Sequence, residues 1–530
     1  MRRRVADNIA AFLAERNIEL YCLALLVGSA GGLAAVALRL AINGVQWLWL
    51  GTMSERIVGA VTQQPWYVVL AAPICGGIVV GLFNQFVLAG KRPGGVADVI
   101  EASARDGQGL GRGTGFWSAV STAISLGSGA SAGREGPVIH LGATLAAAFT
   151  RLTTLPPNCG RIILACGVAS AISASFNAPI AGVLFAHEVI LRHYALRAFV
   201  PITIAAVCGT LVGRYFIGNV AAFDIPTYTI VSYWEMPAFA LLGIAAAAVA
   251  IIFQATLIVF DQSARALPLP HWARPVAGGA IIGVIGIWFP EVLGVGYEAT
   301  DRALLGGFSA QTMLTLLAVK IFATAVTLAS RFGGGIFTPS LYLGAMTGGA
   351  FGLIAANYFP ELASQEGLYA ILGMGAVAAA LLGAPISTVV IVFELTGGYA
   401  LSIALLLVVS LATGLHLAVH GRSFFHWQLE TRGVVLTEGP HRYFLKTVQV
   451  SAFMSARADP SSLTDPDDPA KVRANDSLEK ALRIFNETGA NTLMVVDPRE
   501  RRTVVGTVSH VQALRAFNRR LVETSREEHR

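Results

Sequence analysis

Charged residues are scarce in this chain. Asp, Glu, Lys and Arg make up 13% of its 530 residues, and hydrophobic residues make up 54%, whereas a soluble domain carries about 25% charged residues. This composition excludes an ordinary soluble protein and predicts a polytopic membrane protein in a lipid bilayer. The five cysteines lie in or beside apolar segments and form no C-x-x-C pair, so we expect no metal site and no cofactor.

Basic residues exceed acidic ones only slightly. The net charge is +6, and without a basic stripe on a soluble face no nucleic-acid partner is expected. Residues 1–19 form a mixed leader that begins with three arginines, which the positive-inside rule holds in the cytoplasm. We therefore expect an integral, multi-pass protein of an inner or plasma membrane, with both termini cytoplasmic.

The apolar segments are uneven in length. Segments long enough to cross a bilayer of about 30 Å run roughly over 20–50, 67–90, 198–218, 234–260, 272–289 and 311–329. Shorter, punctuated segments run over 114–131, 136–149, 160–172, 178–191, 336–357, 368–382, 384–396 and 401–420. The second group predicts broken or re-entrant helices within an all-α membrane fold.

Two Gly-rich breaks interrupt these segments. The first reads G-R-E-G-P at 133–137, and the second reads G-G-G-I-F-T-P at 333–339. Helix N-termini present unpaired N–H groups and a partial positive charge, so two such ends can bind an anion between them. We interpret Glu135 as a tethered anion that competes for this site and leaves it when protonated. Arg134 then sets the local potential.

An internal repeat indicates a duplicated fold. In each copy a Glu follows a Pro by nine residues: Glu188 follows Pro179, and Glu394 follows Pro385. Each copy also has a Gly-rich break upstream. Two halves of this kind, about 20–218 and 234–430, are typical of transporters with a site at the interface of the repeats.

Two other motif matches carry less weight. G-A-S-A-G at 129–133 fits a nucleophile elbow with Ser131 at its centre, but no strand precedes it. His187 and His193 are six residues apart, whereas a zinc-protease helix needs its histidines four apart. An intramembrane serine hydrolase therefore remains only a remote alternative, and His140 is interpreted as a packed or cavity histidine.

Residues 20–430 resemble the CLC family of chloride channels and chloride/proton exchangers. The resemblance is carried by G-R-E-G-P at 133–137, G-G-I-F-T-P at 334–339, F-N-A-P at 176–179, G-A-P-I-S-T at 383–388 and F-E-L-T-G at 393–397. It implies an inverted-repeat fold, a homodimer and one anion pathway per subunit. Glu135 would be the gating glutamate, and the N–H groups of Ile336, Phe337 and Gly136 would bind the anion.

The chain departs from the family pattern at three places. Gly94, next to Gly95, stands where the family places an anion-coordinating Ser, and Phe425 stands where it places a Tyr. Val189 occupies the position of the inner proton acceptor of many exchangers. Because valine carries no proton, the sequence favours a passive chloride channel. A coupled chloride/proton antiporter is the alternative, with His187 or Glu188 as substitute proton carriers.

The C-terminal region has a different composition. Residues 431–471 read as a linker, residues 472–523 as a small α/β unit that resembles a CBS motif, and residues 524–530 as a tail. We expect a helix capped by Asp476 and ended at Gly489, strands over 492–496 and 503–508, and a last helix over 511–523. Gln512 stands where nucleotide-binding copies have Asp, so no nucleotide is expected there.

Overall fold

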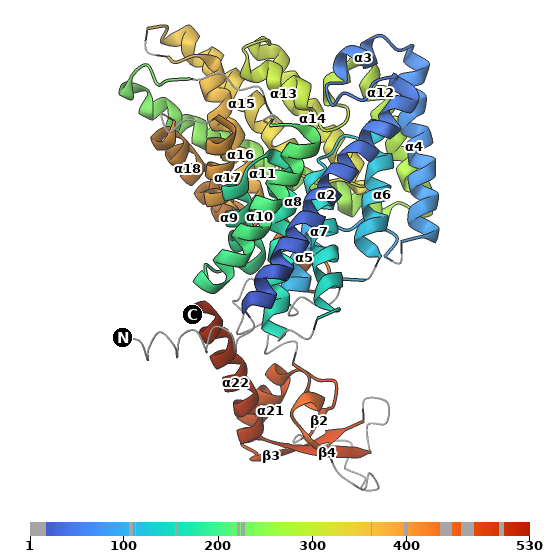
Figure 1. Ribbon diagram of the computed structural model, residues 1–530, viewed down its shortest axis with the longest axis vertical. Coiled ribbons are helices and arrows are strands. Elements are labelled where there is room, and N and C mark those ends of the chain that lie inside the picture. Colours follow the sequence, from blue (N-terminus) through green and yellow to red (C-terminus); the bar gives the residue numbers. More distant parts are fainter. Residues whose placement is uncertain are drawn as a thin grey trace. The chain divides into compact units, whose positions relative to one another are not determined.

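A computed structural model describes residues 17–88, 90–104, 110–111, 113–153, 157–219, 223, 228–361, 363–396, 401–434, 448–456, 471–497 and 503–529. The chain forms two compact units, Met1–Trp427 and Gln428–Arg530, drawn in Figure 1. Most of the predicted leader and linker lies outside the described residues.

The first unit is helical. Its first half contains α2 (Asn17–Leu50), α3 (Val58–Thr62), α4 (Trp66–Phe86), α5 (Val96–Ala104), α6 (Thr114–Gly127), α7 (Glu135–Thr150), α8 (Pro157–Phe176), α9 (Pro179–Phe185), the π-helical turn η1 (Ala186–Leu191) and α10 (Leu196–Ile217). Its second half contains η2 (Tyr233–Glu235), α11 (Met236–Ala266), α12 (Ala273–Trp288), η3 (Pro290–Val292), α13 (Tyr297–Leu304), α14 (Ala310–Ala329), α15 (Phe337–Tyr358), α16 (Glu366–Leu382), α17 (Pro385–Thr396), α18 (Ser402–His420) and α19 (Phe424–Glu430).

Among the described residues, eight helices are long and apolar enough to cross a membrane. Three of them, Cys159–Phe176, Phe337–Tyr358 and Ser402–Glu430, lie where the sequence predicted only short segments. The bounds expected for two of them, 336–357 and 401–420, agree with α15 and α18 to within one residue, whereas α8 extends past 160–172 at both ends. The remaining short helices, such as α9 and α17, confirm the mixture of full and partial spans.

The two halves are structurally equivalent. A spacing of 202 residues separates Gly133 from Gly335, which form an antiparallel bridge, and the same spacing separates Gly142 from Gly344. A Cβ on Gly142 would collide with the Gly167 carbonyl, and a Cβ on Gly344 with the Gly373 carbonyl. Helices α7 and α8 therefore pack as α15 and α16 do, with backbones in direct contact.

Helices α9 and α17 lie side by side in Figure 1, and each is capped by the other's repeat. Glu188 accepts hydrogen bonds from the N–H groups of Ile386 (3.0 Å) and Ser387 (2.8 Å) at the start of α17. Glu394 accepts them from Ile180 (3.0 Å) and Ala181 (2.7 Å) at the start of α9. The two exchanged caps relate the repeats by an approximate two-fold symmetry, which the predicted inverted repeat requires.

The second unit is a small α/β fold. Its elements are η4 (Val450–Ala452), β1 (Ser455–Ala456), β2 (Lys471–Arg473), α21 (Leu478–Thr488), β3 (Thr492–Val496), β4 (Val504–Ser509) and α22 (His510–His529). The sheet order is β1-β4-β3-β2; β2 and β3 are parallel, and β3 and β4 are antiparallel with Leu493 opposite Val508. The side chains of Val472, Phe485, Leu493 and Val508 form part of its apolar core.

The predicted helix of this unit starts one residue later than expected. Ser477, and not Asp476, is the N-cap of α21, and its hydroxyl accepts from the N–H of Lys480. Asp476 instead closes the preceding turn by accepting from the N–H of Arg473 at 2.9 Å. The predicted stop is confirmed, because Gly489 ends α21 with φ +65°, a left-handed conformation that favours glycine.

Candidate functional site

The two Gly-rich breaks meet in space. The N–H of Gly133 donates to the carbonyl of Gly335 at 2.8 Å, and the N–H of Gly335 donates back to Gly133 at 2.7 Å. This bridge brings the first turns of α7 and α15 together. A Cβ built on Gly136 would lie 3.5 Å from the Cα of Gly335 and 4.0 Å from the side chain of Val96, so α5 also begins here.

The N–H groups at these helix starts are available to a ligand. Residue Ile336 precedes α15, and Phe337 is its first residue. Their N–H groups and that of Gly136 have no helical acceptor, and no other hydrogen bond from them is found within the described residues. The predicted anion-binding groups Gly136, Ile336 and Phe337 therefore share one small region.

Glu135 lies at the same junction. It is the first residue of α7 and is 1% exposed. Its Oε1 accepts a hydrogen bond from the hydroxyl of Tyr297 at 3.2 Å, whereas its Oε2 has no partner in the described protein. Oε2 lies beside the Cβ position of Gly133, which is also 3.1 Å from the N–H nitrogen of Thr338. Oε2 and the first turn of α15 therefore both border Gly133, the residue that bridges the two breaks.

Tyr297 and two ion pairs hold this side of the site. Tyr297 is the first residue of α13 and is 3% exposed. The Arg134 guanidinium lies 5.3 Å from the centre of its ring. Arg134 also pairs with Glu55, which pairs in turn with Arg39 at 2.8 Å. Arg134 and Arg39 thus share the single carboxylate of Glu55, and Arg134 lies 3.9 Å from Oε1 of Glu135.

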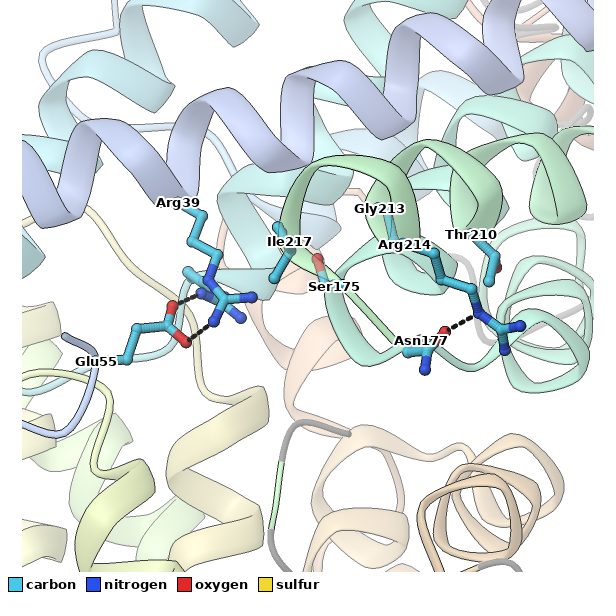
Figure 2. A pocket seen from close by; sticks show the side chains of 11 residues that line it. Arg39, Glu55, Ser175, Asn177, Thr210, Gly213, Arg214 and Ile217 are labelled. Carbon is cyan, nitrogen blue, oxygen red and sulfur yellow. Dashed lines mark hydrogen bonds and ion pairs between the residues drawn. The ribbon is translucent and has the colours of Figure 1, made fainter. Parts of the chain in front are cut away.

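A basic pocket leads to Arg134. Figure 2 shows the Arg39–Glu55 pair at one side of this pocket and the Arg214–Asn177 pair at the other. Arg214 donates to the side-chain oxygen of Asn177 at 2.7 Å. Three guanidinium groups and one carboxylate line the pocket, so its net positive charge attracts small anions.

The other predicted anion-binding residues lie differently. The N–H of Gly94 donates to the hydroxyl of Ser118 at 2.9 Å, and the N–H of Gly95 donates to the carboxylate of Asp98 at 2.8 Å. Both amides are therefore already used. Phe425 is 5% exposed on α19, with its ring 6.3 Å from that of Phe424. The roles of these three residues stay predictions.

The two candidate proton carriers differ in their contacts. Both carboxylate oxygens of Glu188 bind the start of α17, and one also accepts from the hydroxyl of Ser387 at 2.6 Å. A capping role accounts for this carboxylate completely. His187 bonds the carbonyl of His193 through Nδ1 at 3.1 Å and stacks on Tyr194, while its buried Nε2 has no partner in the described protein.

Ser131 has no catalytic surroundings. The residue is fully buried. Its N–H donates to the hydroxyl of Thr327 at 3.2 Å, and its own hydroxyl has no partner among the described residues. A nucleophile elbow needs a base within hydrogen-bonding reach, so the geometry gives the hydrolase alternative no support.

Sequence reasoning missed Tyr297, Glu55 and Arg39. Tyr297 could have been found from the repeat. The spacing of 202 residues that relates the two breaks also relates Gly94 to Gly296, and Tyr297 directly follows Gly296. Glu55 lies in a polar loop 79 residues before its partner Arg134, and no local pattern joins them. Such pairs become visible only once the chain is folded.

Comparison with known proteins agrees with this geometry. Residues 75–416 match the model of the voltage gated chloride channel family. A putative chloride channel protein ClcB-like from Ralstonia nicotianae is 33% identical over 389 residues, covering 72% of this chain and 90% of the relative. An H(+)/Cl(-) exchange transporter ClcA from Cronobacter sakazakii is 30% identical over 406 residues, covering 74% and 85%.

Solved structures share the fold. A slow cyanobacterial Cl-/H+ antiporter superposes with a TM-score of 0.71 at 22% identity, covering 78% of this chain and 97% of that one. A eukaryotic CLC transporter gives a TM-score of 0.67 at 18% identity, covering 94% and 98%. With the family match and the paired breaks, these findings identify the chain as a member of the voltage gated chloride channel (CLC) family of integral membrane anion transport proteins.

Proposed function

We propose that this protein exchanges chloride, or a similar small anion, for protons along a pathway gated by Glu135. The observation that carries the proposal is the buried Glu135 carboxylate, which has one unpartnered oxygen and lies where the two Gly-rich breaks meet. An anion that enters there must displace this carboxylate. Protonation removes the carboxylate's charge and lets it leave, so anion entry and proton uptake occur at one group.

Exchange is favoured over passive conduction, which the sequence preferred because of Val189. Relatives that are 29% and 30% identical to this chain are named H(+)/Cl(-) exchange transporters. Val189 is buried in η1 and offers no proton-binding atom. Glu188 is occupied as a cap, so His187, with its unpartnered Nε2, is the better of the two candidate proton carriers.

The experiment that tests this proposal compares wild type with Glu135→Gln in proteoliposomes. We expect wild type to move protons when a chloride gradient is imposed, at a rate that depends on pH. The Gln variant cannot be protonated, so its anion flux should persist without proton movement or pH dependence. Unchanged pH dependence in the variant would remove Glu135 from the gate.

We further propose a homodimer with cytoplasmic termini. The apolar side chains exposed on α10 and α18, including Leu196, Phe199, Leu211, Ile403 and Leu406, are compatible with packing against a second copy or against lipid. The single CBS-like motif of each subunit would then pair with its copy in the partner. A detergent-solubilised particle with the mass of one chain would contradict this assembly.

The tail is proposed to act without a nucleotide. Gln512 and Ser509 form a reciprocal cap of α22: the N–H of Ser509 donates to Oε1 of Gln512 at 2.8 Å, and the N–H of Gln512 donates to Oγ of Ser509 at 3.2 Å. The amide nitrogen of Gln512 also donates to the hydroxyl of Ser455 at 2.8 Å. The side chain is therefore held by contacts within the unit.

A further inference from the structure

We infer that His140 is an anion-binding residue, and that its imidazole donates a hydrogen bond to the transported anion beside Gly94. This inference rests on the anion pathway proposed above, but not on whether transport is coupled to protons. It goes beyond the interpretation of His140 as a packed histidine, because the polar edge of the ring lies against Gly94, two residues before α5 begins.

The ring occupies the space of a missing side chain. A Cβ built on Gly94 would lie 2.6 Å from Nε2 and 2.8 Å from Nδ1 of His140, and it would also collide with Cε1 between them. These atoms form the polar edge of the imidazole. A side chain at position 94 and the ring of His140 therefore exclude each other, and the glycine lets the two nitrogens reach the start of α5.

One nitrogen of this polar edge lacks a protein partner. His140 is 2% exposed, and its Nδ1 makes no hydrogen bond with the described residues. A buried polar atom without a partner costs about 1–3 kcal/mol, so such an atom is expected to meet a ligand or water. His140 follows Glu135 by five positions on α7, which places it about 1.4 turns further along the helix.

Nearby charge does not oppose an anion. Asp98 is the acidic residue whose charge acts on His140. Its carboxylate is held by Arg92 at 2.6 Å and by the N–H of Gly95 at 2.8 Å. Neutralised in this way, Asp98 repels an approaching anion only weakly, and the start of α5 still contributes the positive end of its dipole.

The second repeat provides an internal comparison. Gly296 and Tyr342 stand 202 residues after Gly94 and His140, and a Cβ on Gly296 would lie 2.9 Å from the Tyr342 ring. There the corner also holds Lys320, whose Nζ is 3.3 Å from the same Cβ position and donates to the carbonyls of Val292 and Gly294. Each repeat thus keeps one buried polar atom without a partner in the described protein, Nδ1 of His140 and the hydroxyl of Tyr342, but only the second repeat also places a lysine in the corner.

The test measures chloride binding to the full-length purified protein by calorimetric titration. His140→Leu keeps roughly the ring's volume but removes its nitrogens, and it should weaken chloride binding about tenfold, the effect of one lost hydrogen bond to a charged ligand. His140→Asn keeps a donor and should stay within about threefold of wild type. Gly94→Ser combined with His140→Ala places a hydroxyl in the vacated space and should bind more tightly than His140→Ala alone.

Tyr342→Phe is the matched control, because it removes the polar atom from the equivalent corner of the second repeat. It should leave chloride affinity unchanged. Wild-type affinity in His140→Leu, or equal losses in the Leu and Asn variants, would overturn the role of His140 as a donor. Absence of chloride binding in wild type would instead refute the proposed anion pathway itself, so the two failures are distinguishable.

Discussion

Removing the Glu188 carboxylate should destabilise the membrane unit without uncoupling transport. Glu188→Ala deletes acceptors for the N–H groups of Ile386 and Ser387 and for the hydroxyl of Ser387. A hydrogen bond to a charged group is worth about 1.5–3 kcal/mol. Because the contact at Ile386 is exposed, water replaces part of what is lost, and we expect a net cost of about 3 kcal/mol.

The assay is thermal unfolding of the purified protein in detergent. A destabilisation of this size lowers Tm by roughly 5 °C in a protein of several hundred residues. Glu394→Ala is the matched control, since Glu394 caps α9 through Ile180 and Ala181 in the same way. Both variants should lose a similar amount of stability.

A measurement of proton coupling distinguishes a helix-capping role of Glu188 from a proton-carrying role. Glu188→Ala protein that remains folded should exchange chloride and protons in the wild-type ratio, because no step passes through this carboxylate. A variant with an unchanged Tm that moves chloride but no protons would refute the reasoning. It would also restore Glu188 as the inner proton carrier.

Two further variants test the contacts around the gate. Tyr297→Phe removes the hydroxyl that donates to Glu135. Because this hydrogen bond holds the carboxylate in place, its loss should raise chloride efflux at pH 7.5 by up to about tenfold, the effect of one hydrogen bond to a carboxylate. Slower efflux would show that the hydroxyl stabilises the open state instead. Gly334→Ala adds a Cβ that collides with Ala132, so it should separate the two breaks and weaken chloride binding. The control Gly414→Ala, whose added Cβ meets no atom within 4 Å, should weaken chloride binding less. Equal chloride affinities in these two glycine variants would mean that the bridge does not shape the site.

Much of the membrane fold was predictable because its signals are local. The breaks at 133–137 and 333–339 and the Pro–Glu pairs at 179–188 and 385–394 stand out in the sequence. Glycine and proline fix where these helices begin whatever surrounds them. The strand Thr492–Val496 and the stop at Gly489 were likewise predicted.

The remainder depends on contacts between distant residues. Glu188 resembles a proton carrier in the sequence, and only the fold shows that it caps a helix 198 residues away. Tyr297 reaches Glu135 across 162 residues. Asp476 and Ser477 are both good N-caps, and the turn that Asp476 closes with Arg473 decides between them.

The most direct test of the central claim is simultaneous measurement of chloride and proton flux from proteoliposomes with the membrane potential held at zero. Our account predicts that an outward chloride gradient drives protons inward against their own gradient, and that Glu135→Gln abolishes this proton movement. Chloride flux without any uphill proton movement in wild type would contradict exchange, and it would identify this protein as a passive channel.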